Sequence, residues 1–182
     1  MNDLTTVDDS RRSDDVREPA RTEENRHQYL SFHLHGRSYA IDGLSVREII
    51  QYQRPTRISM ANPCVHGVIN LRGAVVPVID LGLRFGQAKT RVDRRTCIII
   101  VEVSDDDSTQ PLGILVDAVS EVLEVAPHEM NPPPAFGNPV RSDFIQAMVR
   151  RQDDFIIVLT IANTLAIREL STNPDEKQAV PT

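Results

Sequence analysis

The sequence has no tryptophan, only two cysteines and few aromatic residues (4%), and each shortage excludes a class of protein. Cys64 and Cys97 cannot supply the disulfide framework that holds a small secreted domain together. So few aromatic side chains leave little surface on which bases or sugars could stack. The longest apolar runs, such as Cys97 to Val101, are far too short to cross a bilayer. We therefore expect a reduced, soluble protein without direct membrane insertion.

Positive charge is also in short supply, because the formal net charge is −6 and the pI is near 5.3. A nucleic-acid or anionic-membrane surface needs a field of the opposite sign, so a protein partner is the better fit. The opening segment MNDLTTVDDSRRSDD has no apolar stretch typical of a secretory signal, which predicts a cytoplasmic location. His33 and His35 alternate on one strand but have no third ligand nearby in sequence, so we expect no metal site.

What the chain does contain is one domain of ordinary size between two polar ends. Residues 1–27 are rich in Asp, Glu and Arg and nearly free of apolar side chains, which predicts a disordered N-terminal tail. Residues 171–182 predict a second disordered tail. The remaining span, residues 28–170, has enough apolar residues to bury a core.

The most apolar stretch of that domain is GVINLRGAVVPVIDL, from Gly67 to Leu81. Its β-branched residues predict a hairpin with strands over 68–71 and 74–80 and a turn at Arg72-Gly73. Both faces of the second strand are apolar, which suits a sheet covered on both sides or curled into a barrel. Pro77 has no N–H to donate, so its nitrogen must face outward at an edge or lie at a bulge.

With this hairpin included, the pattern along the chain predicts nine or ten short strands and one short helix over roughly 162–170, which indicates an all-β protein. The segment LSVREIIQYQ fits both helical and extended spacing, and its β-branched content favours a strand. In that strand Glu48 shares a face with Val46 and Ile50. The carboxylate then either lies at an exposed sheet edge or contacts something outside the monomer, because unpaired burial is costly.

Catalytic signatures are missing from the sequence. It has no phosphate-binding glycine loop, nucleophile elbow, metalloprotease helix or kinase signature. Its acids and histidines lack paired spacing. We therefore expect no enzyme activity and no cofactor.

The segment GVINLRGAVVPVIDL resembles the signature of CheW-type domains, the coupling proteins of bacterial chemotaxis, in which Gly, Asn-Leu-Arg-Gly, Pro, Asp and Leu recur at this spacing. Further matching segments are YAIDGLSVREIIQY and TRI before it, and GILVDAVSEVLEV and FIIVLTIANTLA after it. The resemblance covers about residues 28–170. It implies two SH3-like, five-stranded β-barrel subdomains with a shared core.

The resemblance also implies a function. Such a protein is a non-catalytic adaptor that couples chemoreceptors (methyl-accepting chemotaxis proteins) to a CheA-type histidine kinase in a chemosensory array beneath the inner membrane. It binds the kinase and the cytoplasmic tip of the receptor, and we expect a monomer when it is isolated. A CheW-like modulator or inhibitor of a histidine kinase in another pathway, such as surface motility, stays open as the alternative.

Four residues match family positions linked with receptor or kinase binding: Val46, Glu48, Gly67 and Arg72. Arg72 offers a planar, permanently charged fork to a partner carboxylate or carbonyl, or it is simply a solvated turn residue. Gly67 either contributes to the contact or supplies a backbone angle that other residues cannot adopt.

Overall fold

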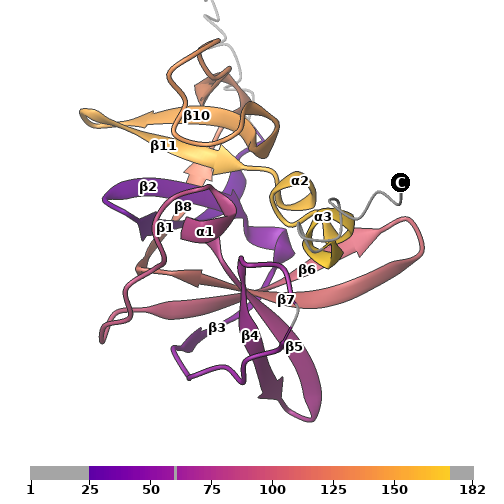
Figure 1. Cartoon of the computed structure of the whole chain (residues 1–182). Coiled ribbons are helices and arrows are strands. Elements are labelled where there is room, and N and C mark those ends of the chain that lie inside the picture. The colour runs from indigo at the N-terminus through magenta and orange to yellow at the C-terminus, as the bar shows by residue number, and fades with distance from the viewer. Residues whose placement is uncertain (1–24, 60, 173–182) are drawn as a thin grey trace, which may run out of the picture.

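The computed structural model describes residues 25–59 and 61–172, which form two β-sheets with short helices between them (Figure 1). The predicted disorder of the two tails concerns residues that lie almost entirely outside this range. The first strand begins at His27 and the last helix ends at Ser171. Within the described residues, no helix is long and apolar enough to cross a membrane.

The first sheet has six strands in the order β8-β1-β2-β11-β10-β9. Their bounds are β1 His27–Leu34, β2 Arg37–Asp42, β8 Ala118–Val125, β9 Met130–Asn131, β10 Ile145–Arg151 and β11 Asp154–Leu159. All neighbours are antiparallel except β2 and β11.

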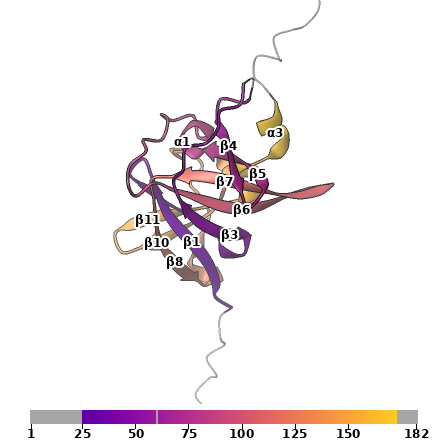
Figure 2. The same cartoon turned by 90° about the horizontal axis from the view of Figure 1, so that it is seen from below.

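The second sheet has five strands in the order β3-β6-β7-β5-β4. Their bounds are β3 Val46–Gln51, β4 Val65–Leu71, β5 Ala74–Asp80, β6 Cys97–Asp105 and β7 Ser108–Val116. Beyond the residues that pair with β3 and β5, the β6–β7 hairpin continues as a two-stranded ribbon that projects from the body (Figure 2). The helical segments are α1 Leu81–Arg84, α2 Ile161–Thr164, α3 Ile167–Ser171 and the 3-10 turns η1 Gly43–Ser45, η2 Pro127–Glu129 and η3 Ser142–Phe144.

The five-stranded sheet curls until its two outer strands, β3 and β4, approach each other. Thr56, in the chain leaving β3, exchanges two backbone hydrogen bonds with Val68 of β4 at 2.8 and 2.9 Å. The hydroxyl of Tyr52 lies 3.3 Å from Nε2 of His66 and joins the same two edges. The six-stranded sheet also curls, so that the side chain of Arg151 on β10 reaches the outer strand β8 and donates to the carbonyl of Glu124 at 3.1 Å.

Each sheet therefore has an inner apolar layer of its own, and a third layer lies between the sheets. The inner layer of the five-stranded sheet includes Ile69, Val78, Ile98, Ile100 and Leu115. The inner layer of the six-stranded sheet includes Tyr29, Leu123, Val125, Val149 and Val158. The layer between the sheets is the largest and takes side chains from both, among them Phe32, Tyr39, Ile99, Ile114 and Leu159. Truncating one such side chain to alanine costs about 2–5 kcal/mol.

This architecture confirms the all-β fold class, with two curled sheets on a shared core and a short C-terminal helix. One sheet has six strands because the two-residue β9 pairs with β10. The structure adds three local details. Tyr29 and Ser31 are buried, since both faces of β1 are covered. The TRI segment forms a single bridge. The predicted C-terminal helix is split into α2 and α3 around Leu165 and Ala166.

The predicted hairpin is confirmed as β4 and β5, and the geometry explains how Pro77 is tolerated. Pro77 lies opposite Val68, whose N–H and C=O point away from β5 to Thr56. Pro77 is therefore in a non-hydrogen-bonded pair with β4. On its other side, the ladder with β7 begins only at Val78. β5 is not an outer strand, but it is locally unpaired at Pro77, as the missing N–H requires.

Candidate protein-binding site

The tip of the β4–β5 hairpin is a two-residue turn in which both residues have positive φ, 51° at Arg72 and 84° at Gly73. Asn70 supports the turn, because its side-chain oxygen accepts from the N–H of Gly73 at 2.9 Å. Turns of this kind favour Asn-Gly, because asparagine and glycine tolerate a positive φ. Arginine is disfavoured in this left-handed region. An unfavourable residue in a strained position is a reason to look for a function.

Arg72 pairs with Glu48. Its Nη2 donates to Oε2 of Glu48 at 2.7 Å, although Glu48 lies on the outer strand β3 and Arg72 lies in the turn that follows β4, the opposite outer strand. The Arg72 side chain is 77% exposed and that of Glu48 is 24% exposed. An ion pair this exposed stabilises a fold by only about 0.2–1 kcal/mol. The pair is therefore a small contribution to stability and a prominent surface feature.

Glu48 also keeps an unused acceptor. Its second oxygen, Oε1, is buried and has no hydrogen-bond partner among the described residues. The ion pair borders a cleft of about 440 Å³ that is also lined by Arg47, Val76 and Ile100. A partner that brings a donor into this cleft would satisfy Oε1, and the free side of the Arg72 guanidinium could bind an acceptor.

Val46 does not share this face, which corrects the expectation that it lies beside Glu48. A β-bulge at Arg47 shifts the register, so Val46 lies opposite Val101 and Glu48 lies opposite Ile100. Because Val101 and Ile100 are consecutive residues of β6, their side chains point to opposite faces of the sheet. Ile50 does lie on the face of Glu48, as expected, because it pairs with Ile98.

On its own face, Val46 lines an exposed apolar groove between the outer strands of the two sheets. Ile49 of β3, Leu44 of η1 and Val122 of β8 line it too, and the groove measures about 440 Å³. Leu44 is 84% exposed, Val122 58% and Ile49 43%. These three residues were not predicted from the sequence, because no local pattern shows that β3 and β8 meet.

Gly67 has a structural reason to be glycine. It is buried, its φ is +149°, and an added Cβ would lie 2.5 Å from the carbonyl oxygen of Thr56 and 2.8 Å from Cβ of Pro55. Any other residue would push away the bridge that joins the two outer strands. A contact between Gly67 and a partner stays a prediction.

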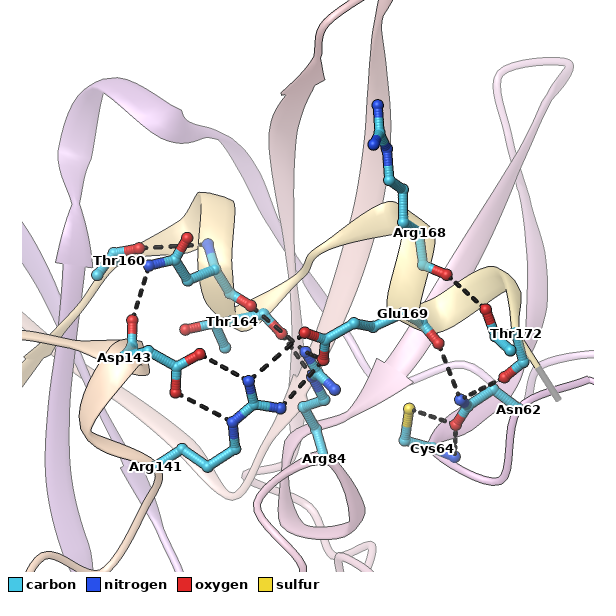
Figure 3. Close-up of polar contacts among 11 residues, drawn as sticks. Asn62, Cys64, Arg84, Arg141, Asp143, Thr160, Thr164, Arg168, Glu169 and Thr172 are labelled. Atoms are coloured by element: carbon cyan, nitrogen blue, oxygen red, sulfur yellow. Dashed lines mark hydrogen bonds and ion pairs between the residues drawn. The ribbon is translucent and has the colours of Figure 1, made fainter. Parts of the chain in front are cut away.

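The C-terminal helices fasten the two sheets together (Figure 3). Glu169 of α3 accepts from Arg84 of α1 at 2.7 Å and from Arg141 beside η3 at 3.1 Å. Both arginines also lie over the ring of Phe144, at 4.7 and 4.5 Å. The two guanidinium groups lower the pKa of Glu169. Because α3 follows β11 and α1 follows β5, this network connects one sheet to the other.

A side-chain amide completes that connection. Asn62, in the loop before β4, donates to the carbonyls of Glu169 and Thr172 at 3.2 and 3.1 Å. The relative position of the two sheets is thus fixed by polar contacts as well as by the shared core. Among the described residues, no three His, Cys, Asp or Glu side chains gather in a way that could hold a metal ion.

Two curled sheets held in fixed orientation, with an ion pair on one side of an outer strand and an apolar groove on the other, define a small all-β scaffold domain. Comparison with protein families identifies which one. The chain matches the model of the CheW-like domain over residues 28–169, and it belongs to that family.

Characterised relatives and a solved structure agree with this assignment. The chain is 31% identical to the chemotaxis protein CheW of Klebsiella aerogenes, over 79% of this chain and 84% of that protein. It is 32% identical to the chemotaxis protein CheW of Bacillus subtilis, over 82% and 93%. The crystal structure of the scaffolding protein TtCheW from Thermoanaerobacter tengcongensis matches with a TM-score of 0.69 and 30% identity, and the match covers 80% of this chain and 91% of that one.

Proposed function

We propose that this chain is a non-catalytic adaptor that couples chemoreceptors to a CheA-type histidine kinase in an array beneath the inner membrane. Membership of the CheW-like family supports the proposal, as do similar proteins named for chemotaxis and for scaffolding. The adaptor transmits receptor state by binding two kinase or receptor arrangements with different affinity.

The observation that carries the proposal is that β3 contributes side chains to two different surfaces. The bulge at Arg47 places Val46 on the same face as Ile49, in the apolar groove, whereas Glu48 lies on the other face, in the cleft beside Arg72. A coupling protein must hold two partners at once, and two surfaces on one rigid strand fix their relative position.

The two surfaces differ in chemistry and therefore suit different partners. The groove exposes branched aliphatic side chains over about 440 Å³, which fits the apolar face of an amphipathic helix. The Glu48–Arg72 cleft offers a charged fork and a buried acceptor, which fits a partner surface with matching polar groups.

A pull-down with kinase and receptor fragments tests the proposal. Glu48→Ala and Arg72→Ala are expected to weaken capture of at least one fragment. Arg150→Ala is the matched control, because Arg150 is exposed on β10 and has no ion pair among the described residues. Unchanged capture by a folded Glu48→Ala/Arg72→Ala protein would reject these two contacts. Failure of the wild type to bind either fragment would reject the adaptor function itself.

The sign of the effect on the kinase separates the proposal from its alternative. In a reconstituted mixture of receptor, kinase and this protein, an adaptor is expected to make kinase activity depend on the receptor. A CheW-like modulator or inhibitor would instead lower kinase activity whether or not receptor is present.

A further inference from the structure

Two loops of the five-stranded half are strongly basic although the chain as a whole is acidic. The loops cover residues 52–59, after β3, and residues 86–96, after α1. Together they have six cations and a single acid, Asp93, a net charge of +5 within a chain of net charge −6. The cations are Arg54, Arg57, Lys89, Arg91, Arg94 and Arg95. All six are exposed.

The fold brings the two loops together. At one end, the N–H of Tyr52 donates to the carbonyl of Thr96 at 3.1 Å. Further along, Arg57 of the first loop and Lys89 of the second line one cleft of about 240 Å³, with His66 as another of its lining residues. We call residues 52–59 and 86–96 the basic loops.

Nothing else in the described residues neutralises the basic loops. None of their six cations has an ion pair there, whereas Arg47, Arg72 and Arg84 each have one. The nearby carboxylate of Asp80 is buried and already accepts from the N–H and the hydroxyl of Thr90 at 3.0 and 2.8 Å. Like charges without counter-charges repel one another, so this arrangement destabilises the fold, and none of the six cations makes an ion pair with a described residue that would offset the repulsion.

The pKa of His66 responds to the cations that line the cleft. Burial lowers the pKa of His66, Lys89 and Arg57 lower it further, and Asp80 opposes them. His66 is therefore a reporter of charge in the cleft. An anion placed between Arg57 and Lys89 would favour protonated His66 and raise its pKa.

Apolar side chains accompany the cations. Ile58 is 49% exposed and Val92 is 46% exposed, and both belong to the basic loops. Val65 and Leu83 help to line the cleft. Cations mixed with aliphatic groups suit a polypeptide that alternates acidic and apolar residues better than a nucleic acid, which needs aromatic platforms or a continuous phosphate-binding groove.

We propose that the basic loops are a docking surface for an acidic segment of a partner protein, with one carboxylate seated in the cleft between Arg57 and Lys89. The cleft shares no residue with the Glu48–Arg72 cleft or with the apolar groove. The inference therefore goes beyond the coupling function and holds whether or not the kinase and receptor bind as proposed.

A free peptide tests the surface directly. The probe is the fluorescently labelled peptide Asp-Leu-Asp-Asp-Leu-Asp, and the control peptide is Ser-Leu-Ser-Ser-Leu-Ser. Fluorescence anisotropy measures the binding of each peptide to the full chain. We expect the acidic peptide alone to bind, and its affinity to fall steeply between about 50 and 300 mM salt, because ions screen exposed charges.

Reversing the charge of Arg57 and Lys89 then tests whether the peptide binds at the cleft. Arg57→Glu/Lys89→Glu is expected to weaken binding about tenfold or more. The matched control is Arg37→Glu/Arg150→Glu, which changes the net charge equally at two exposed arginines of the six-stranded sheet. Equal losses in both double variants would overturn the proposal, as would equal binding of the serine peptide. Circular dichroism establishes that both variants are folded.

His66 supplies a second readout on the unmodified protein. NMR titration of its ring is expected to give a higher pKa in the presence of the acidic peptide, and an unchanged pKa would contradict the seated carboxylate. Single-stranded RNA or anionic vesicles that bind more tightly than the peptide would show that the partner is another kind of polyanion. In that case the assignment to a protein partner is wrong.

Discussion

Replacing Arg72 by asparagine separates a contact role from a structural one more sharply than replacement by alanine. Asparagine tolerates the positive φ of 51° that arginine adopts here, so the turn gains up to about 1 kcal/mol. Loss of the 2.7 Å ion pair with Glu48 removes about 0.2–1 kcal/mol. These terms nearly cancel, and for a domain of this size the melting temperature should change by less than about 3 °C.

Binding should respond very differently. An arginine that anchors an interface commonly contributes about 2 kcal/mol, so Arg72→Asn should weaken binding of one fragment, kinase or receptor, more than tenfold. Calorimetric titration measures the affinity and thermal denaturation the stability. Glu48→Gln and the double variant complete a cycle that shows whether the two side chains act together. Unchanged affinity for both fragments, or a melting temperature lowered by more than about 8 °C, would refute the reasoning.

Three further substitutions test other parts of the structure. Gly67→Ala should destabilise the protein by more than about 2 kcal/mol in urea unfolding, since its Cβ would lie 2.5 Å from a carbonyl oxygen; a neutral effect would leave a direct contact as the better explanation. Val122→Ser should leave stability within about 0.5 kcal/mol and weaken binding of a helical partner to the groove, because Val122 is 58% exposed; unchanged binding to both fragments would exclude Val122 from the interface. Glu169→Gln should lower the melting temperature at pH 7, where the carboxylate is charged and paired with Arg84 and Arg141. The pKa of Glu169 is lowered in the folded state, so its contribution is complete above the ordinary glutamate pKa of about 4.3 and is lost as the pH falls through the folded value; the wild type and variant should converge in acid, and a difference that persists there would contradict the ion-pair explanation.

Local features of the fold could be predicted from the sequence because short-range chemistry decides them. The Arg72-Gly73 turn, the extended conformation of β3 and the buried β6 all follow from residue types within a few positions. The strand pattern indicated the all-β class, and the family resemblance added the two-barrel architecture and the four expected contact residues. Both kinds of evidence lie along the chain itself.

What could not be predicted depends on the curl of the sheets. The Glu48–Arg72 pair joins β3 to the turn after β4, the opposite outer strand, and the groove joins β3 with β8 of the other sheet. The bulge at Arg47 also has no signature, because alternation over VREII reads equally well without it. A period-2 pattern places Val46 and Glu48 together, and the one extra residue in the ladder separates them.

That single extra residue has an evolutionary consequence. Deleting Arg47 would restore regular pairing and leave Val46 opposite Val101, on the groove face, while every residue from Glu48 onward kept its place against β6. Both surfaces would therefore survive the loss of this residue in a duplicated copy of the gene. Copies with and without the extra residue should bind the same two partners, which a comparison of such copies with measured binding would check.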